Sequence, residues 1–167
     1  MPEKETMQRA ERDLAEGKSP STAAGEFVHE EIEHVREGKH GARSPQQAIA
    51  IGLSKARRAG VPLPPPKKGR TSETTRKRAQ REYEKGQSGE ENAPSPRATR
   101  ARKRVPQGEP RSTASHQALS RQTRASARKR SATDRQSAAK KALRTKGESG
   151  LRGAAKKAAR TRTRHRS

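Results

Sequence analysis

The sequence predicts a mainly disordered chain with α-helical segments, in which one antiparallel helical hairpin, about residues 23–59, is the only folded module and no sheet forms. Three observations predict this class. Apolar residues make up only 25% of the 167 residues, and charged residues make up 35%. Trp is absent, and Phe27 and Tyr83 are the only aromatic side chains. The 41 Lys and Arg against 18 Asp and Glu leave a formal charge of +23, so self-repulsion opposes a compact chain.

Charge and composition divide the chain into segments. Residues 1–40 carry six basic and ten acidic side chains, whereas residues 91–167 carry 23 basic and four acidic ones. Stretches rich in Pro, Gly and Ser lie near the boundaries and favour linkers. The expected segments, in order, are an acidic N-terminal segment able to form a helix (1–20), the hairpin module (21–60), a Pro-rich spacer (61–70), a polar helix (71–86), a linker (87–110) and a basic tail rich in Ala, Arg, Lys and Ser (111–167).

The stretch RSPQQAIAIGLSKARRAG, residues 43–60, predicts a helix whose two ends are both specified. Ser44 is a good N-cap, Pro45 suits the first helical position, and Gln47 completes a capping box. Gly60 lies where a left-handed residue commonly ends a helix. Between these ends the apolar residues recur at three- and four-residue spacing, which predicts one apolar helix face.

The partner of this helix lies upstream, in TAAGEFVHEEIEHVREG, residues 22–38. Its apolar stripe and the short loop that follows predict an antiparallel hairpin, in which Gly52 lets the two helices approach closely. Domains below about 40 residues usually need a metal, disulfides or a partner subunit, and the chain has no Cys, so we expect the hairpin to self-associate. The expected hairpin core consists of Phe27, Val28, Ile32, Val35, Ile49, Leu53 and Ala56.

The Pro-rich spacer VPLPPPKKG allows two interpretations. Its prolines favour polyproline II and stop the preceding helix, which is typical of a stiff spacer. Pro62, Pro65 and Lys67 also fit the PxxPxK pattern of a ligand for an SH3 domain.

The hairpin region resembles a known family. The phrases REGKHGARS and QAIAIGLSKARRAG are similar to those of small basic bacterial proteins that share an uncharacterised conserved domain, and the likeness covers about residues 1–85. The resemblance implies a bacterial source and a helical module, and it implies no catalytic residue. The tail, LRGAAKKAARTRTRHRS above all, is similar in composition to the tails of linker histones and bacterial histone-like proteins.

No motif of the sequence supports catalysis, so we expect no enzyme and no cofactor. The segment HEEIEH resembles the H-E-x-x-H zinc helix, but His29 and His34 are five residues apart, about 140° around a helix. The i,i+4 pairs Glu30–His34 and His29–Glu33 explain these residues as a solvated face, and we expect no metal site. No apolar run reaches the roughly 20 residues of a membrane span, so we expect no membrane partner.

The basic residues from 102 onward predict contact with nucleic acid through phosphates. The tail has no aromatic residues for base stacking, and the hairpin lacks the third helix of a helix-turn-helix unit, so we expect nonspecific, salt-dependent binding. DNA is favoured over RNA, at the nucleoid in the cytoplasm; an RNA- or ribosome-associated protein and a hydrophilic stress-protective protein are the alternatives. The expected phosphate contacts are Arg102, Lys103, Arg104, Arg121, Arg124, Arg128, Lys129, Arg130, Arg135, Lys140, Lys141, Arg144, Lys156, Lys157, Arg160, Arg162 and Arg164.

Two patterns in the charged residues add expectations. The triplet Arg-Lys-Arg begins at Arg76, Arg102 and Arg128, and each copy is expected to bind phosphates. Between residues 118 and 143, arginines seven apart would form a row on one helix, but their repulsion predicts coil until phosphates neutralise them. We also expect the glutamates of the first hairpin helix to compete with nucleic acid for the tail; they are Glu26, Glu30, Glu31, Glu33 and Glu37.

Overall fold

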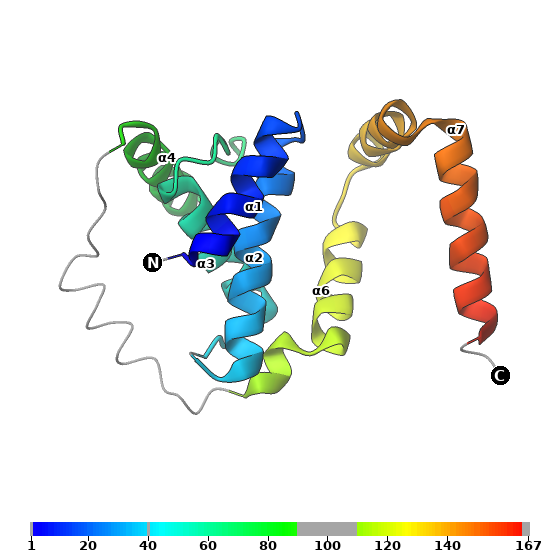
Figure 1. Ribbon diagram of the computed structural model, residues 1–167, viewed down its shortest axis with the longest axis horizontal. Helices are drawn as coiled ribbons and strands as arrows, with labels where there is room; N and C mark the ends of the chain where they lie inside the picture. Colours follow the sequence, from blue (N-terminus) through cyan, green and yellow to red (C-terminus); the bar gives the residue numbers. More distant parts are fainter. Residues whose placement is uncertain (1, 40, 90–109, 165–167) are drawn as a thin grey trace. The chain divides into compact units, whose positions relative to one another are not determined.

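The computed structural model of the protein describes residues 2–39, 41–89 and 110–164. These residues form six α-helices and one 3₁₀ helix, and no strand occurs among them (Figure 1). The chain divides into two compact units, residues 1–122 and 123–167. The expectation of a mainly disordered chain with a single hairpin is therefore wrong. The expectation rested on the low content of apolar residues. The structure forms nevertheless, because small residues, helix caps and buried ion pairs stabilise it where large apolar side chains are few.

The first unit begins with α1 (Lys4–Ala15), which lies along α2 (Pro20–Glu37) (Figure 1). The buried face of α1 consists of Thr6, Ala10 and Asp13, which are three or four residues apart. None of them is a large apolar residue. The acidic N-terminal segment is thus helical, and half-buried Leu14, four residues after Ala10, adds an apolar contact to the core.

The helix predicted from residues 43–60 is confirmed as α3 (Pro45–Arg58). The Ser44 side chain accepts a hydrogen bond from the amide of the third helical residue at 3.2 Å, and Gly60 follows the last turn with a φ of 88°. α3 crosses α2 at Gly52, where an added Cβ would lie 2.6 Å from the Cα of Val28. Only glycine permits this approach, so the predicted close crossing of the two helices is also confirmed.

The Pro-rich spacer packs against the first unit. Val61 is buried and Leu63 packs against the core beside it. The Leu63 amide donates to the Val61 carbonyl at 2.7 Å, which closes a γ-turn, and the Leu63 carbonyl accepts from Nε of Arg57 at 3.2 Å. Pro62 and Lys67, two of the three residues of the PxxPxK pattern, are exposed, so both the spacer and the SH3 ligand stay predictions.

The next helix, α4 (Glu73–Gln87), packs against α3. Ala79 is its buried residue, and the Ser54 hydroxyl of α3 donates to Oε1 of Glu82 at 2.6 Å. At Gly86 an added Cβ would lie 1.8 Å from the carbonyl oxygen of Arg57, so no other residue fits without movement of one helix. α4 is therefore held to the first unit by both close backbone packing and polar contacts.

A 3₁₀ helix, η1 (Arg111–Ala114), lies against the C-terminal end of α2. Nε of Arg36 donates to the Ala114 carbonyl at 2.9 Å. Ala114 is 2% exposed and belongs to a small apolar cluster with Val35, Ala42 and Ala48. The start of the basic region is thus anchored on the first unit.

The core of the first unit is built largely from alanine. The larger of its two clusters surrounds Phe27, the largest fully buried side chain, and the alanines Ala23 and Ala24 beside it are 0% exposed. Small side chains let the helices approach closely, so a core of high packing density forms from little apolar volume. Of the residues expected in the hairpin core, the buried ones are Phe27, Val35 and Ala56, and the half-buried ones are Val28, Ile32, Ile49 and Leu53.

The C-terminal region forms α6 (His116–Arg128) and α7 (Ala132–Arg164). The prediction of coil for this region is wrong. Alanine, arginine and lysine have high helix propensity, and a capping box at the start of α7, formed by Ser131 and Asp134, satisfies its first amides. Gly147, with φ 65° and ψ 173°, divides α7 into two helical parts, residues 132–146 and 148–164.

Candidate nucleic-acid interface

The basic residues of α6 lie on one face of the helix. Arg121, Arg124 and Arg128 are spaced by three and four residues, which places them within about 60° around the helix axis. All three are exposed. The predicted row of arginines along a single helix from 118 to 143 does not continue, because the chain leaves helical geometry between α6 and α7 and Arg135 belongs to a new helix.

The capping box of α7 explains this interruption. The Ser131 hydroxyl accepts a hydrogen bond from the Asp134 amide at 3.1 Å and donates one to the Asp134 carboxylate at 2.8 Å. Such a pair stabilises the first turn of a new helix in place of continuing the old one. Lys129 and Arg130 therefore lie in the connection between two helices, where both are exposed.

The second part of α7 carries cations on several sides of the helix. Arg152, Lys156 and Arg160 recur every four residues, so they form a basic stripe. Ala154 and Ala158 fall on a different side of the same helix. A basic stripe of this kind can follow a row of phosphates, and Lys157 and Arg162 place further cations on the other sides of the helix.

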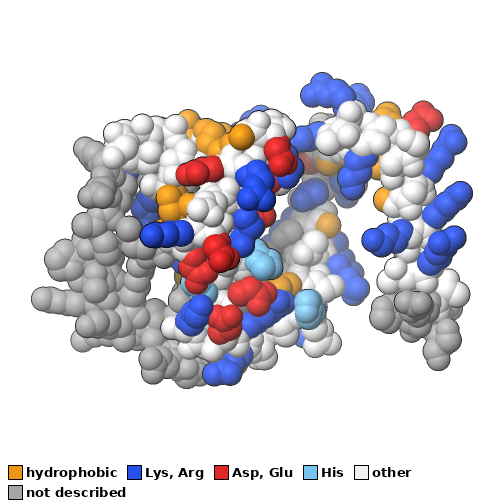
Figure 2. Space-filling view, in the orientation of Figure 1, with side chains coloured by type: hydrophobic (Ala, Val, Ile, Leu, Met, Phe, Trp, Pro, Cys, Tyr) orange, Lys and Arg blue, Asp and Glu red, His pale blue; other side chains and the backbone are white. Residues whose placement is uncertain are grey.

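Cations far outnumber carboxylates in this unit. Residues 123–163 contain fourteen Lys and Arg and only two acidic residues, Asp134 and Glu148. Most of these cations therefore have no carboxylate to pair with and stay in contact with solvent. An example of a pair that does form is Arg152 with Glu148, at 3.6 Å. Figure 2 shows Lys and Arg side chains projecting outward along these helices. The unit therefore presents a strong positive field.

The structure describes most of the predicted phosphate contacts and places them all in solvent. Arg102, Lys103 and Arg104 lie outside the described residues, and the side chain of Arg164 is likewise not described. The predicted contacts with exposed side chains are Arg121, Arg124, Arg128, Lys129, Arg130, Arg135, Lys140, Lys141, Arg144, Lys156, Lys157, Arg160 and Arg162.

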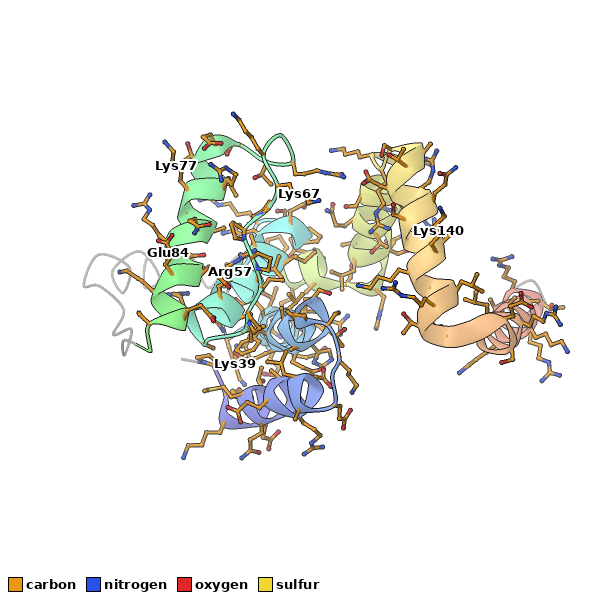
Figure 3. The ribbon with its side chains drawn as sticks, turned by 90° about the horizontal axis from the view of Figure 1, so that it is seen from above. Lys39, Arg57, Lys67, Lys77, Glu84 and Lys140 are labelled. Atoms are coloured by element: carbon orange, nitrogen blue, oxygen red, sulfur yellow. The ribbon has the colours of Figure 1, made fainter. Side chains whose placement is uncertain are left out.

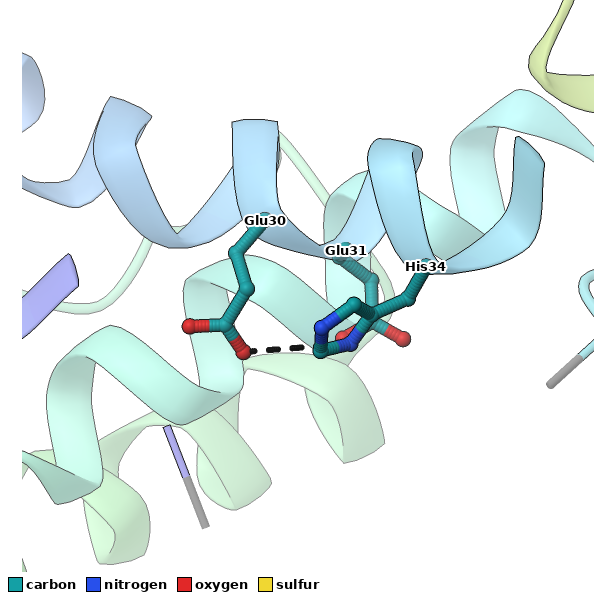
Figure 4. Close-up of side chains that lie close together, drawn as sticks. All are labelled: Glu30, Glu31 and His34. Atoms are coloured by element: carbon teal, nitrogen blue, oxygen red, sulfur yellow. Dashed lines mark ion pairs between the residues drawn. The ribbon is translucent and has the colours of Figure 1, made fainter. Parts of the chain in front are cut away.

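A second cluster of charged side chains lies buried where α1, α2 and α3 meet. Glu30, Glu31 and His34 of α2 offer ligand atoms within 4.8 Å of one another, a set that could hold a metal ion (Figure 4). The ammonium of Lys55, from α3, lies 2.9 Å from Oε1 of Glu30 and 2.7 Å from Oε2 of Glu31. Lys55 thus supplies the positive charge that a metal would bring, and the arrangement is that of a buried ion-pair network.

The network also fixes the start of α1. The amide of Glu3 donates to Oε2 of Glu30 at 3.0 Å, and its carboxylate lies 2.9 Å from Nε2 of His34. Burial alone would raise the pKa of the Glu30 carboxyl, but hydrogen bonds from Lys55, the Glu3 amide and Thr6 outweigh that effect and lower it. The hydrogen bond with His34 is the main cause that lowers the pKa of Glu3. Glu30 is therefore held as a carboxylate inside the first unit.

The acidic face of α2 is engaged within the first unit. Besides the buried Glu30 and Glu31, each of the three remaining glutamates has a cationic neighbour within 3 Å: Glu26 with Arg9 at 2.9 Å, Glu33 with Arg36 at 2.6 Å, and Glu37 with Lys39 at 2.9 Å. The competition between these glutamates and nucleic acid for the tail stays a prediction, and it would have to break these exposed ion pairs, which are individually weak.

Lys55 is the residue that sequence reasoning missed. It lies between Gly52 and Ala56 on the face of α3 that was expected to be apolar, and Glu31 lies between Val28 and Val35 on the facing stripe of α2. Opposite charges within two stripes that are predicted to pack against each other indicate a buried ion pair. That signal was present in the sequence.

Residues 17–68 of the chain match DUF6496, a family of unknown function. The match covers α2, α3 and most of the Pro-rich spacer, so the chain contains an uncharacterised conserved domain at the centre of its first unit. The helices α4, α6 and α7 lie beyond the match. Comparison with curated proteins and with solved structures found no match. Within the described residues, no helix combines the length and apolar character that a membrane span requires.

Proposed function

We propose that the protein binds nucleic acid nonspecifically, that α6 and α7 contact the phosphates, and that it acts at the nucleoid in the cytoplasm. The observation that carries this proposal is the ratio of fourteen cations to two carboxylates over residues 123–163, with every one of those cations exposed. Neutralising phosphates releases condensed counterions, and this release supplies the binding free energy without a need for base contacts.

Helical cations support DNA over RNA as the partner. The major groove of B-form DNA is wide enough to admit an α-helix, whereas the major groove of A-form RNA is deep and narrow. In α6 and in both parts of α7, many of the residues between the cations are alanine or serine, whose small side chains keep the diameter of the helix low. Neither helix carries an aromatic residue, so stacking on unpaired bases does not contribute, and a duplex is the expected form.

Self-association through α2 and α3 is a separate part of the proposal. Within one chain, α1 and η1 already cover part of the surface of α2 and α3, so less apolar surface is left for a second copy to bury. Ile49 and Ile51 of α3 remain half-buried and could contact a second copy. Sedimentation over a wide range of protein concentration tests this part; a monomer throughout that range would contradict it.

The binding experiment compares two variants that each remove two positive charges. Fluorescence anisotropy of a labelled duplex, DNA or RNA of one sequence, is measured over a series of salt concentrations with the full chain. The Arg124→Gln/Arg128→Gln variant should lower the slope of log affinity against log salt by about 0.9 for each phosphate that is no longer neutralised. The control, Lys4→Gln/Arg12→Gln, removes exposed cations of α1 and should leave the slope near that of the original protein.

Two outcomes would contradict the proposal. If the protein binds neither the DNA duplex nor the RNA duplex, the proposed nucleic-acid binding is contradicted. If it binds but its affinity does not change with salt, binding through phosphates is contradicted. Tighter binding to the RNA duplex than to the DNA duplex would leave phosphate contact intact and would replace DNA by RNA as the partner.

A further inference from the structure

α4 and the turn before it carry a second group of cations, on the first unit. Residues 67–85 contain eight Lys and Arg and three Glu. The turn is closed by a hydrogen bond from the Arg70 amide to the Lys67 carbonyl at 3.1 Å, and Gly69 within it has a φ of 84°. None of these cations belongs to the proposed contacts on α6 and α7.

The three glutamates of this segment are each engaged locally. Glu73 forms two hydrogen bonds with Arg76, at 2.7 and 3.1 Å, and Glu84 accepts from the Gln80 amide at 2.6 Å. Glu82 accepts from Ser54 of α3 at 2.6 Å and from Arg78 at 3.3 Å. The triplet Arg76, Lys77 and Arg78 is therefore divided, because its two arginines face carboxylates of their own helix.

Lys77 and Arg81 remain open to a ligand. They are four residues apart, about 6 Å along the helix, and both are exposed. Neither side chain forms a hydrogen bond or ion pair within the described part of the chain, and Lys77 acts on Glu73 only at longer range, where it adds to the hydrogen bond from Arg76 in lowering the pKa of that carboxyl. Together with Arg76 and Gln80 they line a shallow hollow of about 270 Å³ in which every lining side chain is a hydrogen-bond donor. Figure 3 shows Lys77 directed away from the body of the first unit.

The helix that carries this hollow is firmly positioned. Gly86 permits backbone contact with Arg57, and the side-chain amide of Gln87 donates to the Gly60 carbonyl at 3.0 Å. Arg57 is buried between these elements, and burial lowers the pKa of its guanidinium (Figure 3). The backbone that carries the hollow is therefore preorganised, and binding would need to order only the exposed side chains of Lys77 and Arg81.

We infer that the hollow formed by Arg76, Lys77, Gln80 and Arg81 binds phosphates of a nucleic-acid backbone, as a second contact in addition to that of the C-terminal helices. The inference rests on the proposed function and extends it to the first unit. Two linked contacts on one polyanion strengthen each other, because binding at one raises the local concentration of phosphate at the other.

The chemistry of this face favours nucleic acid over an anionic membrane. A helix that binds a membrane surface places large apolar side chains beside its cations. On α4 the only apolar residues are Ala79, which is buried, and Tyr83, which is half-buried. The cations of the hollow therefore have no apolar neighbours that could enter a bilayer.

The test neutralises the two open cations in the full chain. Lys77→Gln/Arg81→Gln should lower the salt slope for a DNA duplex by about 0.9 for each phosphate released, and so by about 1.8 for two, with weaker binding at moderate salt. The variant Lys4→Gln/Arg12→Gln, which removes the same charge from α1, should change the slope far less. Because all four side chains are exposed, helical content should stay the same in both variants.

A second measurement uses the unaltered chain. Chemical acylation of lysines, followed by mass spectrometry, should show that the duplex protects Lys77 more strongly than Lys4. Vesicles of phosphatidylserine and phosphatidylcholine serve as the comparison ligand and should give no protection of Lys77.

The outcomes separate this inference from the proposed function. If the unaltered chain binds duplex with a steep salt slope but the Lys77 and Arg81 variant behaves like the α1 control, the hollow is not a phosphate site. Equal acylation of Lys77 with and without duplex would also overturn the phosphate site, and protection by vesicles alone would assign the hollow to lipid. If the unaltered chain shows no salt-dependent binding, the proposed function fails as well.

Discussion

The two units use the same few residue types in opposite ways. In the first unit the lysine of α3, Lys55, lies 10% exposed between two buried glutamates, whereas Lys140 of α7 is exposed (Figure 3). Alanines follow the same division: Ala24 is 0% exposed, and Ala154 is exposed. The difference follows from the carboxylates, which number 16 against 25 Lys and Arg in the first unit and only two against 16 in the second. Charge balance therefore decides whether an Ala- and Lys-rich helix packs or stays solvated.

The source of stability differs accordingly. The helices of the first unit contact one another through buried alanines, glycine crossings and ion pairs, so their stability is cooperative. The N-terminal part of α6, up to Gln122, belongs to the first unit and hydrogen-bonds to it through Gln46. Every basic residue described in α7 is exposed, so helix propensity and its cap are the main stabilising contributions there. A substitution in the first unit should therefore change the stability of the whole unit, whereas one in α7 should change the stability of that helix only.

The largest effect is expected from removal of Lys55. Lys55→Met leaves the carboxylates of Glu30 and Glu31 buried without their cation, and breaking a buried pair in this way costs about 3–5 kcal/mol. Unfolding by urea is followed by the fluorescence of Tyr83, the single tyrosine, which reports on the first unit alone.

Two controls accompany this variant. Lys4→Met removes an exposed lysine of α1 and should leave the urea midpoint almost unchanged. Adding Glu30→Gln and Glu31→Gln to Lys55→Met should recover part of the missing stability, because the uncompensated charges are then gone. A Lys55→Met protein as stable as the original would show that the network does not stabilise the first unit.

The second effect tests the glycine crossing. Gly52→Ala places a Cβ 2.6 Å from the Cα of Val28, so one helix must shift, and overpacking of this kind costs about 1–3 kcal/mol. Gly25→Ala in α2 is the matched control, since nothing lies within 4 Å of its added Cβ. There alanine should stabilise the helix by about 0.5–1 kcal/mol. Equal effects at the two glycines would contradict the close crossing.

The sequence predicted the parts of the fold that depend on local signals. The ends of α3 follow from Ser44 and Gly60, and its approach to α2 follows from Gly52, all of which the structure confirms. The capping box that starts α7 is a local signal too, since Ser131 and Asp134 have the required spacing, but the expectation of coil rested on charge repulsion alone.

The remaining features depend on contacts between distant residues. α1 packs through Ala10 and Leu14 together with the polar Thr6 and Asp13, and two apolar residues are too few for hydrophobic periodicity to detect. Lys55 and Glu31 would stand out only if the two stripes were first paired across the hairpin. The hollow on α4 depends on which cations pair with carboxylates. That pairing involves another helix, because Glu82 also accepts a hydrogen bond from Ser54 of α3. Composition alone could not separate these open cations from the paired ones.

Lowering the pH should reduce the stability of the first unit more than that of the second, by a smaller amount than the substitutions above. The pKa of Glu30 is lowered in the folded protein, so its contribution to stability is present above the ordinary glutamate pKa of about 4.3 and is lost as pH falls through the lower folded value. The first unit should therefore lose stability in acid, and Glu30→Gln should flatten this dependence. The second unit, with only Asp134 and Glu148 as carboxylates, should respond little. Amide hydrogen exchange, corrected for intrinsic rates at each pH, measures both units.

The smallest effect compares two serine caps of the same geometry. Ser131 accepts from the Asp134 amide at 3.1 Å in the second unit, and Ser72 accepts from the Thr75 amide at 3.2 Å at the start of α4. Each serine-to-alanine change should cost about 1 kcal/mol. Because α4 packs on α3, Ser72→Ala should lower the urea midpoint read from Tyr83. Ser131→Ala should leave that midpoint unchanged and speed amide exchange only in the first part of α7, by roughly fivefold for 1 kcal/mol. If Ser131→Ala also shifted the Tyr83 transition, the two units would share their stability, and the division between packed and solvated helices would fail.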